Sequence, residues 1–382
     1  MIVNVSGLTT FHVVDLAREM ARLSCLGKFY TGLPSSMTHG VPNDKVCRQP
    51  LLLAGLYLAR RLRSTWLHRT LDRPTADLFS RWLAAHVGQC DVFHCLSGVG
   101  LRAHRMARQR YGALTVCDRG SPHIGYQDDL LRDEYARWGL PYAGTDPRAI
   151  EAELSEYEEC DLITIPSTFS WNSFVERGVP VAKLAKLPYG VDLSQFHPIE
   201  KRDRVFRALF VGQMSIIKGL PYLLEALATL RLPDFELCLI GSLSPEVHPF
   251  LEKYAGGYTY LGPKPRAELY RYYSQASVFV MASIGEGFGL VQAQAMACGV
   301  PVIATVNTGA PDLFADGVEG FIVPIRDAEA IREKVLYLYE NPNIQLQMSQ
   351  AALRQVQSIG GWNTYGESAA RTYAQVLLKH AG

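Results

Sequence analysis

The sequence predicts a two-domain α/β protein in which each domain is built on a doubly wound parallel sheet. The chain has 382 residues, which is long for one domain and sufficient for two. Strand-like and helix-like segments alternate regularly in the second half, and such alternation is typical of parallel sheets covered by helices. The first half opens with the same strand–turn–helix order. We therefore expect domains over 1–190 and 191–360, followed by a C-terminal helix over 361–382.

The second half carries the clearer pattern. Short apolar runs predict strands at 207–213, 235–241, 258–263, 278–283, 301–306 and 321–324. Apolar side chains at helical spacing predict helices at 218–230, 266–276, 289–299 and 327–341. Gly299, with Pro301 just beyond it, is a helix stop signal, so the third of these helices should end there.

The first half is looser. We expect strands at 3–7, 28–32, 91–98, 113–120 and 162–167, and a helix over 11–23. Between 34 and 90 the alternation breaks into a Pro-bearing, basic insert. A cluster of Pro, Gly and charged residues at 187–204 predicts the link between the domains. The last segment, 362–380, reads as one amphipathic helix.

Charge and cysteine content narrow the class of protein. The chain has 38 Lys and Arg against 37 Asp and Glu, so it shows no overall bias toward nucleic acid. Its first 110 residues carry 15 basic and 6 acidic side chains, which favours an anionic partner for this part. The eight cysteines show no CxxC pair or zinc spacing, which indicates reduced thiols and a cytoplasmic location. The first residues lack the pattern of a signal peptide.

A basic stretch at 57–74 lies inside the insert. Apolar side chains at 57, 59, 62, 66 and 67, with Arg at 60, 61, 63, 69 and 73, predict one amphipathic helix. A basic helix with a Trp can attach the protein peripherally to the anionic inner face of a membrane. The commoner alternative is a surface helix that docks on its own domain. The longest apolar run, 51–59, is too short to span a bilayer.

The segment GEGFG at 285–289 follows a predicted strand and precedes a predicted helix. Free N–H groups and the helix dipole make such a corner attractive to phosphate. Gly287 and Gly289 would let the backbone approach a ligand closely. A carboxylate repels phosphate, so Glu286 should reach past it to sugar hydroxyls. The alternative for such a short motif is a capped structural turn.

A second turn between a predicted strand and a predicted helix supports a ligand-binding site. In FVGQMSIIKG, Gly212 stands at another strand end and Lys218 at the start of the next helix. A lysine there can neutralise a diphosphate, although a solvated surface lysine is the commoner case. Two glycine corners on one sheet, one with an acid and one with a lysine, fit a nucleoside diphosphate-sugar.

Several long segments resemble a known family. Residues 210–227, 261–283 and 286–305, followed by GVEGFIVP, are similar to the donor-binding domain of family 4 glycosyltransferases, and LPYGVDLSQF resembles their interdomain segment. The first domain is similar only in outline. The resemblance implies the GT-B fold, two Rossmann-like domains facing across a cleft with a C-terminal helix that crosses back. It also implies retaining transfer of a sugar from a UDP- or GDP-sugar to a hydroxyl of a glycan or lipid-linked glycan.

The resemblance assigns roles to residues of the second domain. Glu286 would orient the donor sugar and Lys218 would neutralise its diphosphate. Two positions depart from the family pattern: Gln294 stands where a ribose-binding Glu is usual, and Gln213 where an Arg is usual. An amide can still hydrogen-bond a diol, without charge assistance. The remaining donor contacts implied are Gly7, Gly212, Pro263, Gly287, Phe288, Gly289 and Leu290.

Candidates in the first domain cluster at predicted strand ends. TVCDRGSPHI brings Asp118, Arg119, Ser121 and His123 together, and we expect Asp118 and His123 to shape the catalytic mouth. The alternatives are a surface Asp–Arg pair and a loop histidine. Near the first strand, Thr9, Thr10 and His12 could line the acceptor side or the donor phosphate. His94 reads as a satisfied core histidine.

The sequence also bears on mechanism and on rival functions. No Asp-x-Asp motif occurs, so we expect no metal and no other cofactor, with Lys218 and helix dipoles stabilising the leaving group. The resemblance implies front-face retention. Rival functions are a GT-B epimerase, a phosphorylase, and a non-catalytic or degenerate nucleotide-sugar binding protein. The two glutamines motivate the last of these.

Overall fold

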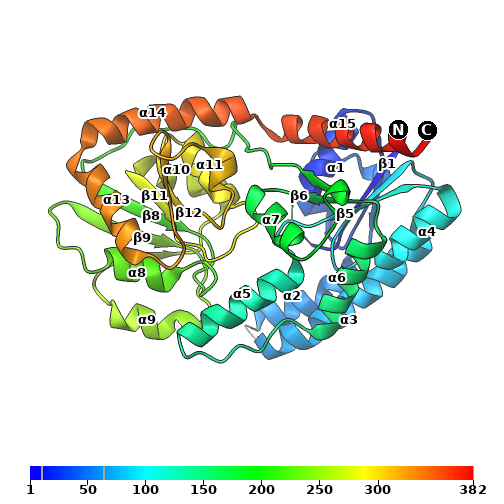
Figure 1. Cartoon of the computed structure of the whole chain (residues 1–382), viewed down its shortest axis with the longest axis horizontal. Coiled ribbons are helices and arrows are strands. Elements are labelled where there is room, and N and C mark those ends of the chain that lie inside the picture. Colours follow the sequence, from blue (N-terminus) through cyan, green and yellow to red (C-terminus); the bar gives the residue numbers. More distant parts are fainter. Residues whose placement is uncertain (10–11, 63–64, 382) are drawn as a thin grey trace.

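The computed structural model describes residues 1–9, 12–62 and 65–381, and these form two lobes that each enclose a parallel sheet (Figure 1). The first lobe contains a seven-stranded sheet whose neighbours all run parallel. Its strands, in spatial order, are β3 (Val46–Arg48), β2 (Leu26–Thr31), β1 (Val3–Gly7), β4 (Val92–Leu96), β5 (Leu114–Asp118), β6 (Leu162–Ile165) and β7 (Leu184–Lys186). The chain winds outward in both directions from β1, as in a doubly wound sheet.

Helices connect the strands of the first lobe. They are α1 (Val13–Arg22), α2 (Ala54–Arg61), α3 (Thr65–His86), α4 (Leu101–Tyr111), α5 (Ile124–Arg137), α6 (Pro147–Glu159) and α7 (Thr168–Glu176). The predicted insert over 34–90 is not external to the sheet, because it supplies the edge strand β3 and the helix α3. Phe79 and Leu83 of α3 are fully buried, which explains why this segment packs into the lobe.

The second lobe repeats the architecture. Its six parallel strands, in spatial order, are β10 (Thr259–Gly262), β9 (Phe235–Ile240), β8 (Phe206–Val211), β11 (Val278–Met281), β12 (Val302–Thr305) and β13 (Gly320–Val323). Its helices are α8 (Leu220–Leu227), α9 (His248–Lys253), α10 (Leu269–Gln275), α11 (Leu290–Ala297), α12 (Ala310–Leu313), α13 (Ala328–Glu340) and α14 (Pro342–Ile359). The predicted alternation in this half is confirmed. The helix α14 was not predicted.

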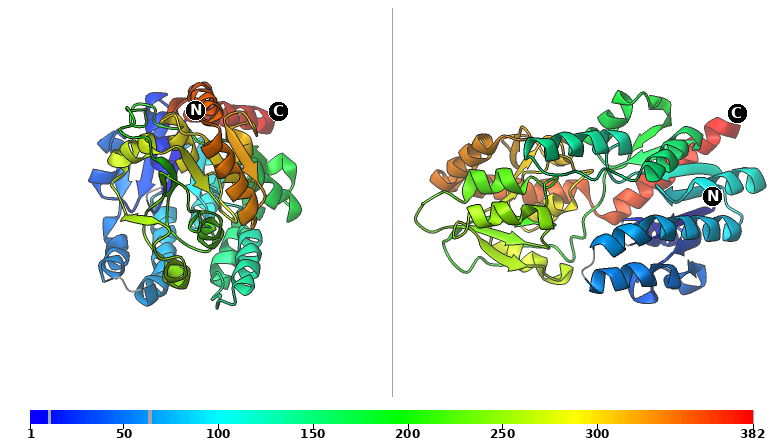
Figure 2. Two further views of the ribbon diagram at one scale, coloured as in Figure 1. Left: turned by 90° about the vertical axis from the view of Figure 1, so that its left-hand side faces the viewer. Right: turned by 90° about the horizontal axis from the view of Figure 1, so that it is seen from below.

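The chain ends on helix α15 (Trp362–Ala381), which crosses back to the first lobe and packs against α1 (Figures 1 and 2). An ion pair of 2.9 Å between Arg22 and Glu367 joins the two helices. Gly366 lets them approach, since a Cβ there would lie 2.3 Å from the Cβ of Glu19. The expected return of the last helix is confirmed. We propose a domain boundary near residue 190, within the segment that links β7 to β8.

Helix α5 also joins the lobes. Trp138, just beyond its end, packs edge-to-face on Tyr222 and Phe250 of the second lobe, with ring centroids 5.2 and 4.9 Å away. The carboxylate of Glu134 is fully buried, pairs with Arg326 at 2.6 Å and accepts a hydrogen bond from Tyr222. Since a buried carboxylate requires such partners, these contacts fix how the lobes face each other.

One expectation about the basic stretch 57–74 changes. The structure divides it between α2 and α3 rather than forming one helix, and Arg63 and Ser64 lie outside the described residues. Exposed apolar side chains nevertheless remain on this surface, notably Tyr57, Leu58 and Leu62. No helix in the described ranges is both long enough and apolar enough to cross a membrane.

Candidate functional site

The glycine-rich loop, residues 285–289, connects β11 to α11. Its last residue, Gly289, has φ of +78° and serves as the N-cap of α11, a conformation that favours glycine. The backbone N–H of Glu286 donates to the carbonyl of Asn307, which follows β12. The loop is therefore held at the carboxyl ends of two neighbouring strands, where open α/β sheets bind ligands.

The lysine loop, residues 212–219, lies directly beside it. Gly219 has φ of +66°, and a Cβ there would lie 1.8 Å from the carbonyl oxygen of Ala282. The N–H of Ile284 donates to the carbonyl of Ile217. These backbone contacts bring together the two predicted loops, although three α-helices and three strands, α8 to α10 and β9 to β11, separate them in the sequence.

The two main candidates of the second lobe contact each other. The ammonium of Lys218 forms an ion pair with the carboxylate of Glu286, and both side chains are partly exposed. Burial lowers the pKa of the Lys218 amine to about 8, so the amine still carries its charge at neutral pH. A cation and a carboxylate at the strand ends can contact different parts of one ligand: the cation binds its phosphate and the carboxylate binds its hydroxyl groups.

The two glutamines differ in their surroundings. Gln213 is exposed, and its amide donates to the hydroxyl of Ser244. Gln294 is 7% exposed on α11, where its amide oxygen accepts a hydrogen bond from Tyr273 at 3.2 Å. Gln294 is therefore part of a buried contact as well as a candidate for ribose. Pro263 lies in the exposed loop after β10, while Leu290 opens α11.

Residues that follow β5 and β6 of the first lobe contact the glycine-rich loop. A Cβ on Gly287 would lie 1.9 Å from the carbonyl oxygen of Gly120, in the loop after β5. The hydroxyls of Ser167 and Ser170, after β6, both donate to the carbonyl of Gly287. The expected reason for glycine at this position thus changes: it admits the backbone of the first lobe.

Protein atoms also fill the space around Phe288 and Gly289 of the glycine-rich loop. A Cβ on Gly289 would lie 2.6 Å from the amide nitrogen of Gln292 and 2.8 Å from the methyl carbon of Met281. The ring of Phe288 is buried and packs edge-to-face on Tyr189 of the interdomain segment, with centroids 5.4 Å apart. The side chain of Phe288 is therefore an interdomain contact.

Asp118 lies in a buried network rather than at an open mouth. Its carboxylate is 2% exposed and contacts His12, His94 at 3.0 Å and the hydroxyl of Thr164 at 3.0 Å. Burial would raise the pKa of Asp118, but the charges and hydrogen bonds of His12 and His94 outweigh it and hold the pKa well below its ordinary value. In the structure Asp118 therefore lies inside the first lobe, whereas the sequence predicted it at the mouth of the catalytic site.

The network extends to the C-terminal helix. The hydroxyl of Tyr373 lies 2.8 Å from Nδ1 of His94, which is fully buried, in agreement with the expected core histidine. The ring of His12 stacks on Tyr189, with centroids 4.2 Å apart. The network therefore connects the start of α1 with β4, β5, β6 and α15.

His123 also differs from its expected role. Its Nδ1 accepts a hydrogen bond from the N–H of Gly125, so the side chain caps α5. Its ring packs between Tyr157 and Phe174 and is 5% exposed. Burial lowers the pKa of His123 to about 4, and the positive charges of Arg177 and Arg119 add to this shift. The side chain therefore packs into the interior of the first lobe.

A cavity of about 550 Å³ opens at the carboxyl ends of β1 and β4. Its lining begins with Leu8, which directly follows Gly7, the last residue of β1. Thr9 lines the cavity, while Thr10 lies outside the described residues. Polar and charged side chains around it include Asp72, Arg73, Ser97, Thr145, Asp146 and Glu153. Such a lining suits a ligand rich in hydroxyl groups.

Sequence reasoning missed several residues at these strand ends. Asp312 of α12 accepts hydrogen bonds from the backbone and hydroxyl of Thr168 and pairs with Lys186 at 2.6 Å, so it clamps the lobes together. Asn307 and Ser167 hold the glycine-rich loop. The sequence carried a signal for these positions, because Ser167 ends one predicted strand and Asn307 and Asp312 come after another, and ligands bind at the carboxyl ends of strands.

The arrangement offers few ligands for a metal ion. Over the described ranges, no three His, Cys, Asp or Glu side chains come together in a way that could hold one. The polar groups that converge on the glycine-rich loop are instead a cation, a carboxylate, amides and hydroxyls. Chemically, this set can bind and orient a phosphorylated sugar.

Comparisons with known proteins agree with this geometry. Residues 193–355 match the family described as glycosyl transferases group 1. D-inositol 3-phosphate glycosyltransferase of Pseudarthrobacter chlorophenolicus is 30% identical over 263 residues, which cover 63% of this chain and 62% of that protein. The match therefore spans less than two thirds of that relative's length.

Solved structures share the whole fold. Sucrose-phosphate synthase from Thermosynechococcus elongatus has a TM-score of 0.77 at 20% identity, with both chains covered completely. Anabaena HepE in complex with UDP-glucose has a TM-score of 0.70 at 16% identity, with 98% of this chain and 100% of that chain covered. These similarities, at low identity, confirm the predicted GT-B arrangement of two Rossmann-like lobes.

Proposed function

Residues 193–355 belong to the glycosyl transferases group 1 family, and from this premise we propose that the chain is a retaining glycosyltransferase. It transfers a sugar from a nucleoside diphosphate-sugar to a hydroxyl group of a glycan or lipid-linked glycan, and it is cytoplasmic. The observation that carries the proposal is the pairing of Lys218 with Glu286 at the strand ends of the second lobe. One group fits the diphosphate and the other fits the sugar of the same donor.

The roles follow from these positions. Lys218 neutralises the charge that develops on the leaving diphosphate, and the N-terminus of α11 adds its partial positive charge. Glu286 accepts hydrogen bonds from the hydroxyls of the donor sugar and so fixes its orientation. Gln294 and Gln213 contact the ribose and the phosphates with neutral amides. The leaving phosphate oxygen takes the proton of the incoming hydroxyl on the same face.

The residues of the first lobe support this chemistry indirectly. Asp118, held by His12 and His94, keeps the loop after β5 rigid, and this loop touches Gly287 through Gly120. Asp118 is therefore a positioning residue. Rigid support of this kind matters because a displacement of about 1 Å at a reacting centre can cost a hundredfold in rate.

The acceptor belongs to the cavity at the ends of β1 and β4. Its carboxylates Asp72, Asp146 and Glu153 can accept hydrogen bonds from several hydroxyls of a glycan. The Pseudarthrobacter relative is named for D-inositol 3-phosphate, a phosphorylated cyclic polyol, and the hydroxyl groups of such a polyol would also fit these carboxylates.

The surface of α2 and α3 supports peripheral attachment to an anionic membrane. Tyr57, Leu58 and Leu62 are exposed beside Arg61. We expect the protein to sediment with phosphatidylglycerol vesicles at low salt, and a double change Leu58→Ser with Leu62→Ser should weaken this. Equal sedimentation with neutral and anionic vesicles would contradict an electrostatic attachment.

One other function has a specific observation in its favour. Gln213 and Gln294 replace charged residues of the family pattern, which fits a nucleotide-sugar binding protein without transfer activity. Incubation with UDP-, GDP- and ADP-sugars and a set of glycan acceptors distinguishes the two. The enzyme should release nucleoside diphosphate and give a product whose NMR spectrum retains the donor's anomeric configuration. Nucleotide binding without any release would favour the binding protein.

A further inference from the structure

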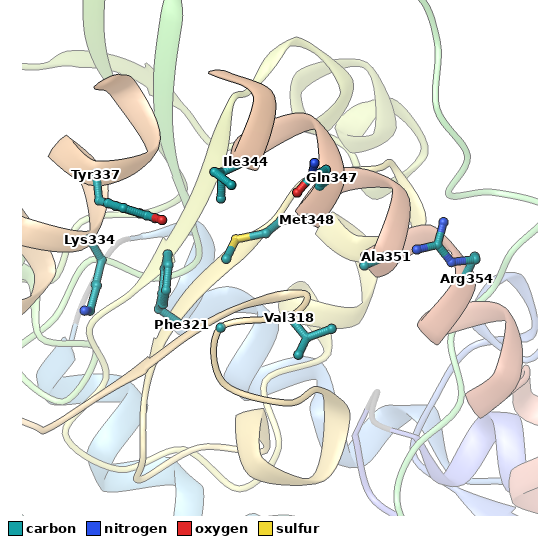
Figure 3. Close-up of a pocket in the computed structure, with 10 residues that line it drawn as sticks. Val318, Phe321, Lys334, Tyr337, Ile344, Gln347, Met348, Ala351 and Arg354 are labelled. Atoms are coloured by element: carbon teal, nitrogen blue, oxygen red, sulfur yellow. The ribbon is translucent and has the colours of Figure 1, made fainter. Parts of the chain in front are cut away.

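A second cavity lies in the second lobe, between α13, α14 and the edge strand β13, and it has no part in the donor or acceptor sites described above. Its volume is about 560 Å³, within the range of pockets that hold small molecules. Figure 3 shows its walls: Lys334 and Tyr337 project from α13, Phe321 rises from β13, and a row of side chains follows α14.

The apolar part of the cavity is well defined. Phe321 and Tyr337 meet edge-to-face with ring centroids 5.8 Å apart. Ile344, Met348 and Ala351 share one face of α14, because they are spaced by four and three positions. Together these side chains form a surface for a ring or a short branched chain. Tyr337 is 44% exposed, so water currently covers aromatic surface that a ligand could bury.

The charged part of the cavity has one sign. Lys334 and Arg354 line it from opposite ends, and its described lining contains no Asp or Glu. The ammonium of Lys334 lies 5.1 Å from the centroid of the Phe321 ring, a cation–π contact. Within the part of the chain that the structure describes, neither cation forms an ion pair. Both remain available to an anionic group.

We propose that this cavity binds a phosphate ester with an apolar body of about the size of a phenyl ring or a short alkyl chain. The phosphate lies at Lys334, beside the aromatic rings, and the apolar body lies against Phe321, Tyr337 and Met348. A ligand with only one of these properties fits less well. Inorganic phosphate would leave the aromatic side chains exposed to water, and a neutral hydrocarbon would make no ionic contact with Lys334. The ester could be a free metabolite or the headgroup region of an anionic lipid.

Phenyl phosphate is the first probe, with binding measured by calorimetry on the full chain. We expect the wild type to bind phenyl phosphate more tightly than inorganic phosphate or phenol. Lys334→Ala should weaken binding about tenfold, the loss expected for one charge-assisted hydrogen bond. Lys253→Ala is the matched control, since Lys253 also lies over an aromatic ring, 4.9 Å from the centroid of Tyr254, but lines no part of this cavity.

Two further variants separate this site from the donor site. Lys218→Ala should bind phenyl phosphate as the wild type does, while Lys334→Ala should bind nucleoside diphosphates as the wild type does. Should phenyl phosphate bind Lys334→Ala and wild type equally, or lose its affinity in Lys218→Ala, the proposal would be overturned. Neither result depends on the chain being a glycosyltransferase.

Vesicles identify the source of the ester. Vesicle binding is measured on the Leu58→Ser, Leu62→Ser double variant, so that attachment through α2 does not mask it. If phosphatidylglycerol vesicles retain this variant but not its combination with Lys334→Ala, the ligand is an anionic lipid. If only soluble esters bind, the ligand is a small metabolite. Absence of binding in both forms, with the variants folded by circular dichroism, would overturn the proposal.

Discussion

Lys218 and Glu286 form an ion pair even though they belong to different loops at the ends of β8 and β11. The pair is partly exposed and stands where the strand ends of the first lobe press on Gly287. A diphosphate would compete with Glu286 for the ammonium, and sugar hydroxyls would then take over the carboxylate. Binding of the donor would therefore replace the ion pair with two contacts, one between Lys218 and the diphosphate and one between Glu286 and the sugar.

The first prediction concerns pH. Because burial lowers the pKa of Lys218 to about 8, the amine is charged below that pH and loses its proton above it. Affinity for the preferred nucleoside diphosphate should therefore fall as the pH rises from 7 to 9, measured by isothermal titration calorimetry. Lys218→Arg should show a flat profile, since a guanidinium keeps its charge. A wild-type profile as flat as that of the variant would refute the assignment.

The second prediction concerns Glu286. Glu286→Gln should lower kcat/KM for transfer by about a hundredfold, because the amide lacks the charge that orients the sugar. Affinity for the free nucleoside diphosphate should be unchanged or tighter, since Lys218 loses its competing partner. Glu340→Gln on the exposed face of α13 serves as the control. Equal loss of nucleotide binding and of transfer would mean that Glu286 acts only on the fold.

The third prediction concerns the two neutral amides. Gln294→Glu converts the acceptor of the Tyr273 hydrogen bond into a charged one, and it should strengthen the contact with ribose. We expect the KM for the donor to fall about threefold to tenfold, and Gln213→Arg to act in the same direction. Steady-state kinetics with a fixed acceptor give both values. A gain of activity from zero would instead identify the natural chain as a degenerate enzyme.

The fourth prediction concerns the contact between the lobes. Gly287→Ala would place a methyl group 1.9 Å from the carbonyl of Gly120, so the lobes must separate or the glycine-rich loop must shift. We expect transfer to fall by about a hundredfold and the radius of gyration in small-angle scattering to rise. Gly88→Ala is the control, because its methyl would lie 3.5 Å from the nearest atom, an ordinary contact.

The fifth prediction concerns a buried carboxylate outside the donor site. Glu156 accepts hydrogen bonds from the N–H groups of Gly98, Gly100 and Leu101. Burial raises its pKa to about 7, and the charge of Glu153 adds to the rise despite those bonds. The folded state then binds a proton more tightly than the unfolded state.

That difference sets the sign of a pH effect on stability. The contribution of Glu156 is most favourable below its unfolded pKa of about 4.5, and it is lost progressively as the pH rises through about 7. The loss should be on the order of 3 kcal/mol in the free energy of unfolding. Glu156→Gln should remove this part of the pH dependence between pH 5 and 8 in denaturant titrations, whereas Glu159→Gln on the same helix should not.

The fold was largely predictable because its pattern is local. Alternating apolar runs gave the strands β8 to β13, and the stop signal at Gly299 marked the end of α11. Helix α14 was missed because its polar residues, such as Gln345 and Gln355, weaken the apolar pattern while tertiary packing against α11 stabilises it. The stretch 57–74 was divided for a similar reason, since contacts with the rest of the lobe decide where a helix ends.

The candidate site was predictable only in part. Glu286 and Lys218 could be paired from two glycine corners on one sheet, because strand order alone brings such corners together. The surroundings of Asp118 and His123 could not be predicted, since rotamers and partners from distant segments decide whether a side chain faces a ligand or the interior. His94, Tyr373 and His12 illustrate this, as they meet only after α15 crosses back.

The most direct test of the account is nucleotide binding by the wild type and Lys218→Ala. Thermal unfolding is followed with UDP, GDP, ADP and their sugar conjugates, since a ligand that binds the folded state raises the midpoint. We predict that one nucleotide family raises the midpoint of the wild type and that Lys218→Ala loses this shift while remaining folded. The same shift in both proteins, or none with any nucleotide, would contradict a donor site at the ends of β8 and β11.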